Sequence, residues 1–102
     1  MKVTNMISPQ GNKVVNQYII ETNQGKYFQS YESMIAFIPN NPRKLYLDNR
    51  DNKKWNILLD ETYWDYSRTS LKYLNIFLGT TSKKQIEQRI KSGEYILTDL
   101  NK

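Results

Sequence analysis

The sequence contains no cysteine and no histidine among its 102 residues. Histidine is the commonest general base and metal ligand in proteins, and cysteine is a common nucleophile and zinc ligand. Their absence excludes catalytic dyads and triads of the usual kinds and ordinary zinc sites, although carboxylate, lysine and tyrosine chemistry stays open. The lack of cysteine also fits a reducing compartment, because small secreted domains often depend on disulfides.

Long apolar runs and glycine-rich loops are missing as well. The longest apolar stretches, such as Ile57–Leu59 and Ile76–Leu78, are far too short to cross a bilayer, and Met1–Ser8 lacks a signal-peptide pattern. The four glycines are scattered, so no phosphate-binding loop is predicted. We therefore expect a soluble, cytoplasmic protein that makes no membrane contact and needs no cofactor.

The chain carries 15 basic and 10 acidic residues, and the net charge of +5 is spread along its length. A modest positive charge favours polyanionic partners, but it also serves solubility alone. The length suits one domain, so we expect residues 1–102 to form a single domain. Aromatic residues make up 13% of the chain, and their large rings are expected to supply much of the core.

Alternating β-branched and aromatic residues predict strands in the first 60 positions. Asn23-Gln24-Gly25 suits a three-residue hairpin loop in which Gly25 adopts the left-handed conformation. An apolar run over Ser33–Ile38 ends at Pro39. Residues 14–60 therefore predict an antiparallel meander. The predicted strands of this part are Met1–Gln10, Val14–Thr22, Lys26–Tyr31, Arg43–Asp48 and Trp55–Asp60.

The apolar spacing becomes helical after Tyr63. Leu71, Leu74 and Leu78 share one face of a first helix, which Asp65, Ser67 or Thr69 caps and Gly79 ends. The second helix starts with the capping-box pair Ser82 and Gln85, buries Ile86 and Ile90, and ends at Gly93. A last strand follows over Glu94–Leu100. The predicted fold is α+β, with an antiparallel sheet of about five or six strands and two C-terminal-half helices packed on it.

The acidic cluster comprises Asp60, Glu61 and Asp65, and it is the one group of carboxylates close enough in sequence to suggest a magnesium or calcium site. Its spacing matches no known cation loop, and it does not form a defensible acid/base pair. Helix capping and loop solvation explain the cluster more simply. We therefore predict neither catalytic residues nor a metal site.

The hexapeptide Trp64–Thr69 has two interpretations. As a partner-binding patch, it offers Trp64 or Tyr66 as an anchor and Arg68 for bidentate contacts, and such residues are enriched at interface hot spots. As a strand-to-helix corner, it buries Trp64, caps the helix with Asp65 and pairs Arg68 with a nearby acid. The corner is the simpler interpretation.

Basic and aromatic residues interleave upstream and across this corner, a composition that suits single-stranded nucleic acid held on aromatic platforms. The same aromatics alternate as core residues would, and several acids dilute the charge. The candidate residues for contact with nucleic acid or another partner are Arg43, Lys44, Arg50, Lys53, Lys54, Trp55, Trp64, Tyr66 and Arg68.

Three segments, Asn16–Ser33, Trp64–Leu78 and Ser82–Asn101, carry YFQSY-like, WDYS-like and SGEYILTDLN-like motifs at Tyr27–Tyr31, Trp64–Ser67 and Ser92–Asn101. Together they resemble a family of small domains of unknown function encoded by phages and mobile elements of low-GC gut bacteria. The resemblance implies a mobile-element setting and no enzyme class. Arg43–Leu59 is longer than the usual spacing, so its basic residues are specific to this chain.

These observations predict a non-enzymatic phage or mobile-element accessory protein that binds a macromolecule. The partner is expected to be nucleic acid or a host nucleoprotein or defence complex, which the protein would inhibit. The alternative is a protein–protein interaction module or homo-oligomer that makes no contact with nucleic acid. A third class, an enzyme using a divalent cation, requires Asp60, Glu61 and Asp65 to converge. The sequence does not give the oligomeric state.

Overall fold

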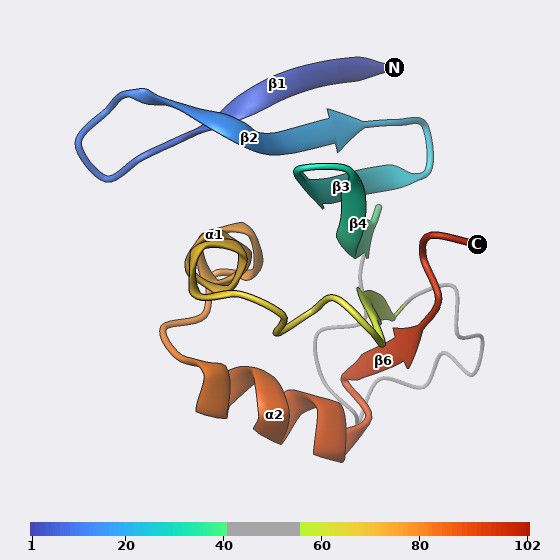
Figure 1. Cartoon of the computed structure of the whole chain (residues 1–102). Helices are drawn as coiled ribbons and strands as arrows, with labels where there is room; N and C mark the ends of the chain where they lie inside the picture. Colours follow the sequence, from blue (N-terminus) through green and yellow to red (C-terminus); the bar gives the residue numbers. More distant parts are fainter. Residues whose placement is uncertain (41–55) are drawn as a thin grey trace.

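The structure is a computed structural model that describes residues 1–40 and 56–102. Figure 1 shows two layers, with a sheet on one side and two helices against it. In chain order the elements are β1 (Lys2–Ile7), β2 (Lys13–Glu21), β3 (Gly25–Ser30), β4 (Ser33–Pro39), β5 (Ile57–Asp60), α1 (Arg68–Leu78), α2 (Lys83–Ser92) and β6 (Tyr95–Thr98).

All six strands of the described residues join one sheet in the order β1-β2-β3-β4-β5-β6. Strands β1 to β5 pair antiparallel with their neighbours, whereas β6 runs parallel to β5. The predicted α+β class is thus confirmed, and the parallel pair is a difference in detail. Both helices lie between β5 and β6 in the chain, and such a crossover returns the chain to the same end of the sheet.

The predicted strands are present where the structure describes them. β2 and β3 have the predicted lengths and start one residue earlier, whereas β1, β5 and β6 are shorter than predicted. β1 ends at Ile7, because the chain turns between Ser8 and Asn12, where the Ser8 N–H donates to the Asn12 carbonyl at 2.8 Å. β5 starts at Ile57, and β6 covers four residues of the predicted Glu94–Leu100. The predicted strand Arg43–Asp48 lies outside the described residues.

The position and conformation of Gly25 differ from those predicted for the hairpin loop. It pairs with Pro39 as the first residue of β3, and its φ of +156° differs from the left-handed helical value that was expected. The reason for glycine is the close approach of β4, since a Cβ at this position would lie 2.7 Å from the Pro39 Cα. The turn is closed instead by Thr22, whose N–H donates to the Gly25 carbonyl at 2.8 Å.

Helix α1 begins at a side-chain cap and ends at a glycine. Among the three predicted capping residues, Ser67 accepts from the Ser70 N–H at 3.1 Å, so the corner interpretation was wrong in assigning this role to Asp65. Gly79 ends the helix with a φ of +75°, as predicted.

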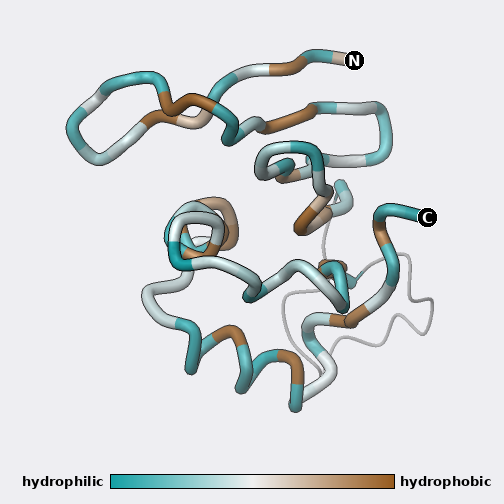
Figure 2. The backbone as a smooth tube through the Cα atoms, viewed as in Figure 1, coloured by the Kyte–Doolittle hydropathy of each residue, from teal (hydrophilic) through white to brown (hydrophobic). Residues whose placement is uncertain are grey.

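Helix α2 confirms its predicted signals. The Ser82 hydroxyl accepts from the Gln85 N–H, and the Gln85 side chain in turn accepts from the Thr81 N–H at 2.9 Å. Gly93 ends the helix with a φ of +87°. Figure 2 shows hydrophobic and hydrophilic residues alternating along α2, and Ile86 is fully buried.

The core lies between the helices and one face of the sheet. The rings of Phe28 on β3 and Phe77 on α1 approach to 5.7 Å between centroids. Burying each aliphatic or aromatic side chain fully contributes about 1.5–3 kcal/mol. The buried cluster comprises Met6, Phe28, Ile35, Ala36, Leu59, Tyr73, Leu74, Ile86 and Tyr95.

Candidate functional site

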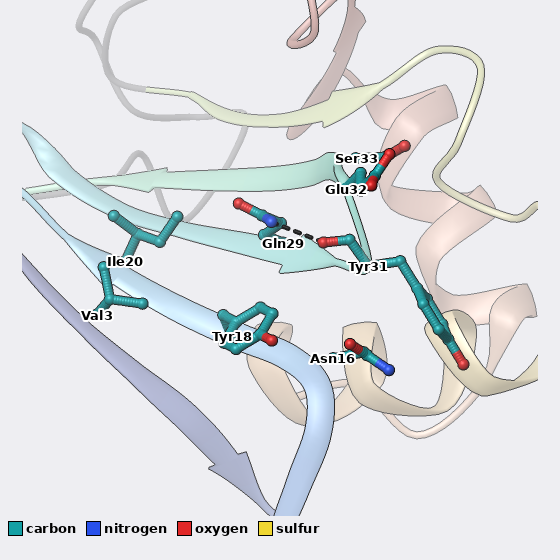
Figure 3. A pocket seen from close by; sticks show the side chains of 8 residues that line it. All are labelled: Val3, Asn16, Tyr18, Ile20, Gln29, Tyr31, Glu32 and Ser33. Carbon is teal, nitrogen blue, oxygen red and sulfur yellow. Dashed lines mark hydrogen bonds between the residues drawn. The ribbon is translucent and has the colours of Figure 1, made fainter.

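The other face of the sheet carries no helix of the described residues. Figure 3 views this face with the helices behind the strands. Strand pairing places Tyr18 opposite Gln29, and Tyr27 opposite both Ile20 and Phe37. The rings of Tyr27 and Phe37 lie 4.5 Å apart between centroids. The side chains that β1 to β4 present here are aromatic, aliphatic or uncharged polar groups.

A hollow of about 690 Å³ opens on this face along β2 and the end of β3 (Figure 3). Two tyrosine rings and two side-chain amides give it stacking surfaces together with hydrogen-bond donors and acceptors. We call it the Tyr18–Tyr31 hollow. Its lining residues are Val3, Asn16, Tyr18, Ile20, Gln29, Tyr31, Glu32 and Ser33.

The rim of the hollow has an unusual backbone. Asn16 and Tyr31 have φ angles of +68° and +56°, and they are the non-glycine residues with positive φ among the described residues. The Tyr31 N–H donates to the Asn16 carbonyl at 2.7 Å, and the Gln29 amide donates to the Tyr31 carbonyl at 2.6 Å. Tyr31 is the first of the two residues that connect β3 to β4, and two-residue hairpin turns favour a positive φ at that position. Asparagine adopts a positive φ readily, whereas a bulky tyrosine there is strained, and such strain is often found at binding sites. The hairpin thus sets the shape of the rim, and the tyrosine at its turn is the unusual choice.

The groups around the hollow are suited to contact and hydrogen bonding. Hydroxyl, amide and carboxylate groups surround it, and no histidine or cysteine is available in the sequence to activate a nucleophile. Within the described residues, no group of three or more acids could hold a metal ion. Rings flanked by donors and acceptors bind a surface or a planar group through contact area and hydrogen bonds.

The acidic cluster predicted from the sequence does not converge. Asp60 is buried, and its two carboxylate oxygens accept four hydrogen bonds from N–H groups. Glu61 is exposed, and Asp65 lies 3.4 Å from the Lys83 ammonium. Hydrogen bonding thus explains Asp60 without a cation.

The corner residues Trp64, Tyr66 and Arg68 lie between β5 and the first turn of α1. Trp64 is half-buried against the core, with the Lys83 ammonium 5.9 Å from its ring centroid. Tyr66 is exposed and meets Tyr63 edge to face at 5.4 Å. Arg68 is exposed, and within the described part of the chain no carboxylate lies within 4.0 Å of it.

None of these three residues lines the Tyr18–Tyr31 hollow. The other candidates, Arg43, Lys44, Arg50, Lys53, Lys54 and Trp55, lie outside the described residues. The sequence interpretation missed the hollow because it singled out charged residues. The usable signal was the strand Lys26–Tyr31, where Tyr27, Gln29 and Tyr31 alternate with core residues.

Shifted pKa values gather at another place, the junction of α2 and β6. The Arg89 guanidinium donates to the Tyr95 hydroxyl at 2.9 Å and lies 3.8 Å from the Glu94 carboxylate. Burial raises the pKa of both Glu94 and Tyr95, whereas the hydrogen bond to Tyr95 raises the pKa of Arg89. Tyr95 is a core residue, so the cluster serves packing between α2 and the sheet.

Among residues 1–40 and 56–102, no helix has the length and apolar character needed to cross a membrane. Comparison with curated proteins and with solved structures gives no match. A model described as a family of unknown function, DUF8033, matches residues 1–93, which include every residue of the Tyr18–Tyr31 hollow. The matched segment ends before β6. The chain therefore belongs to the DUF8033 family of unknown function.

Proposed function

We propose that this protein is a non-enzymatic binding protein that covers the surface of a protein partner with its Tyr18–Tyr31 hollow. The observation that carries the proposal is the tyrosine- and amide-lined hollow, with Asn16 and Tyr31 held at positive φ on its rim. Tyrosine supplies large contact area at low entropic cost, and asparagine and serine supply adaptable hydrogen bonds. This combination suits a protein surface.

Charge also favours a protein at this face. The charged residue that lines the hollow is Glu32, an acid that would repel a phosphate backbone. Tyr31 is 52% exposed, so its ring is available to enter a partner. Trp and Tyr side chains at the centre of an interface typically contribute 2 kcal/mol or more, about a thirtyfold change in affinity.

The proposed setting is the cytoplasm of a bacterium, with the gene carried by a phage or mobile element. The YFQSY-like, WDYS-like and SGEYILTDLN-like motifs support this setting, and the absence of cysteine fits a reducing compartment. The partner is then a host protein, including the protein surface of a nucleoprotein or defence complex that the chain would inhibit.

Two exposed tyrosines provide a matched test. The tagged protein would be used to capture partners from a host lysate, in parallel with its Tyr31→Ala and Tyr66→Ala variants. Tyr66 is 44% exposed and lies outside the hollow, so it controls for the loss of an exposed ring. We expect the native chain and Tyr66→Ala to capture a partner that Tyr31→Ala does not capture. The affinities of the three proteins for the purified partner should follow the same order.

A partner held equally by Tyr31→Ala would show that the hollow is not the binding surface. Light scattering of the protein alone separates a homo-oligomer from a heterologous complex. A native chain that captures no partner and stays monomeric would end the proposal.

Nucleic-acid binding is the second candidate, favoured by the net charge of +5 and by exposed basic residues on both helices. Arg68 and Lys72 lie one turn apart on α1, and Lys83 and Lys84 open α2. Gel-shift assays with single- and double-stranded DNA and RNA at low and moderate salt test it. Binding that weakens steeply with salt, and weakens further in Arg68→Ala, supports this candidate. No binding at low salt removes it, along with the predicted contacts of Arg43, Lys44, Arg50, Lys53, Lys54 and Trp55.

A further inference from the structure

β1 forms one edge of the sheet and is the longer of the two edge strands. Among residues 1–40 and 56–102, β1 (Lys2–Ile7) pairs only with β2, and the other edge strand, β6, covers the four residues Tyr95–Thr98 (Figure 1). An edge strand offers unpaired N–H and C=O groups to an added strand, and short edges reduce this tendency. Within the described chain, β1 is therefore the better template for strand addition.

The helix layer covers β1 only in part. Met6 on β1 is buried in the core, whereas on the helix side of the sheet burial falls from complete at Phe28 on β3 to partial at Ile19 on β2 and low at Thr4 on β1. Ile7 and Ile76 stay exposed by 51% and 45% on either side of this open strip. Exposed aliphatic groups of this size beside a free edge mark an interaction surface.

Two grooves fill the strip between β1, β2 and α1. One, of about 630 Å³, lies along β1, and the other, of about 400 Å³, reaches the end of β4. Met6, Ile19 and Ile76 line both grooves, so the two adjoin along these apolar residues and are treated together. We call the pair the Ile76 channel. A strand added beside β1 would point alternate side chains into it.

The charged residues that line the Ile76 channel are Lys13 and Lys26. Lys72 lies one turn before Ile76 on α1, so it extends the positive charge along that helix. One acid opposes these groups in the described residues, since the Glu21 carboxylate lies 3.7 Å from the Lys26 ammonium. The channel thus favours a segment with aliphatic side chains along it and acidic residues at its two ends.

We propose that an extended, acidic segment of another protein adds as a strand beside β1, with its aliphatic side chains in the Ile76 channel. Main-chain hydrogen bonds to an edge supply affinity in this mode, and the pockets for alternate side chains supply specificity. This surface meets the Tyr18–Tyr31 hollow at Val3, which lines both. The two share no other lining residue, so variants can test them separately.

A second copy of the chain fits this edge poorly. β1 has the sequence KVTNMI, which contains a lysine and no acid. In the register that matches the full length of β1, an antiparallel copy would place its Lys2 opposite Ile7, two strand spacings or about 10 Å from Lys13 on β2. The copy would thus add positive charge near Lys13 and offer no acid to the lysines of the channel, so an acidic partner is favoured over self-association.

Peptide binding followed by fluorescence anisotropy tests the proposal. The probe is a labelled synthetic peptide with valine or isoleucine at alternate central positions and aspartates at both ends. Its counterpart carries lysine in place of each aspartate. We expect the acidic peptide to bind at least about tenfold more tightly than the lysine peptide, since like charges across an interface suppress binding. We also expect hydrogen exchange of the β1 amides to slow when the acidic peptide is bound.

Matched variants locate the site. Lys13→Glu and Ile76→Glu should each weaken acidic-peptide binding by about tenfold or more. Lys84→Glu reverses an exposed lysine on α2 away from the channel, and Tyr31→Ala alters the hollow; both should bind as the native chain does. Circular dichroism confirms that each variant is folded.

Several outcomes would overturn the inference. The inference would be wrong if the acidic peptide did not bind, if both peptides bound equally, or if Lys84→Glu weakened binding as much as Lys13→Glu. Dimerisation of the native protein in sedimentation, abolished by Ile7→Lys, would assign the edge to a second copy instead. Loss of peptide binding in Tyr31→Ala, with binding retained in Ile76→Glu, would assign the peptide to the hollow.

Discussion

The side-chain amide of Asn101 donates a hydrogen bond to Oδ1 of Asp60 at 3.0 Å, although the two residues are 41 positions apart. The same oxygen accepts the Leu100 N–H at 2.8 Å, and Oδ2 accepts the N–H groups of Thr62 and Tyr63. Asn101 also exchanges hydrogen bonds with the backbone of Met34. Asp60 therefore joins the end of β5 to the C-terminal segment, and Asn101 extends that link to β4.

Replacing Asp60 with Asn should destabilise the fold strongly. The amide keeps one acceptor oxygen but points an N–H₂ group at donors, so buried N–H groups lose their partner. A hydrogen bond to a charged group contributes about 1.5–3 kcal/mol, so we expect Asp60→Asn to lower the free energy of unfolding by about 3 kcal/mol in urea denaturation. Asp99→Asn is the control, because exposed Asp99 accepts only the Asn101 N–H. Equal losses in both variants would contradict a special role for Asp60.

The local signals in the sequence predicted the helices well, since each depends on neighbouring residues. Ser67, Gly79, Ser82 and Gly93 all occupy the helix ends that their residue types favour. The parallel β5–β6 pair and the Asp60–Asn101 link join positions far apart in the chain, so no local pattern reveals them. Gly25 illustrates the same limit, because its requirement comes from β4 and not from its own turn.

The candidate site was harder to predict from the sequence than the fold. The interpretation followed charge and tryptophan, and it selected Trp64, Tyr66 and Arg68, none of which lines the hollow. The hollow depends instead on the positive φ of Asn16 and Tyr31. Asparagine is enriched at positive φ, so Asn16 offered a weak signal, whereas the tyrosine at position 31 offered none.

The burial of Tyr95 beside Arg89 leads to a prediction about alkaline pH. Burial raises the pKa of Tyr95 above its ordinary value of 10.0, so the folded state holds this proton more tightly than the unfolded state. The contribution of protonated Tyr95 to the free energy of unfolding is fully present below pH 10.0. It is lost as the pH rises from there through the raised pKa of Tyr95 in the folded state. Denaturation followed between neutral and strongly alkaline pH should show this decline.

Tyr95→Phe isolates that effect. At neutral pH the variant should lose about 1–2 kcal/mol, since the Arg89 guanidinium loses its acceptor. Above the ordinary tyrosine pKa, its unfolding free energy should decline less steeply than that of the native chain. Tyr66→Phe, at an exposed position, should keep the native slope. Parallel pH profiles for the native chain and Tyr95→Phe would refute the assignment.

Gly25→Ala should destabilise the fold through a clash with β4. A Cβ at this position would overlap the Ile38 carbonyl oxygen and lie 2.9 Å from the Phe37 ring. Overpacking of this kind costs about 1–3 kcal/mol. Gly11→Ala is a matched control, because Gly11 also has a positive φ of +86° but has open space around it. Its cost should be limited to backbone strain of about 1 kcal/mol. Equal losses would show that backbone conformation, not the contact with β4, explains Gly25.

The buried side chain of Gln17 lies beside Ser30 across the β2–β3 pair, and neither side chain has a hydrogen-bond partner in the described structure. A buried amide without partners costs about 1–3 kcal/mol, whereas an apolar side chain of similar shape removes that cost. Gln17→Met should therefore raise the free energy of unfolding by about 1 kcal/mol in urea denaturation. Gln88→Met, at an exposed position on α2, should leave stability nearly unchanged.

Gln17 is the chain neighbour of Asn16, which has a positive φ at the rim of the hollow. Partner capture by Gln17→Met is therefore the second measurement. A more stable variant that loses the partner would show that this amide supports the rim at a cost in stability. A less stable variant would show that the amide is already satisfied in solution, by buried water that bridges it to Ser30.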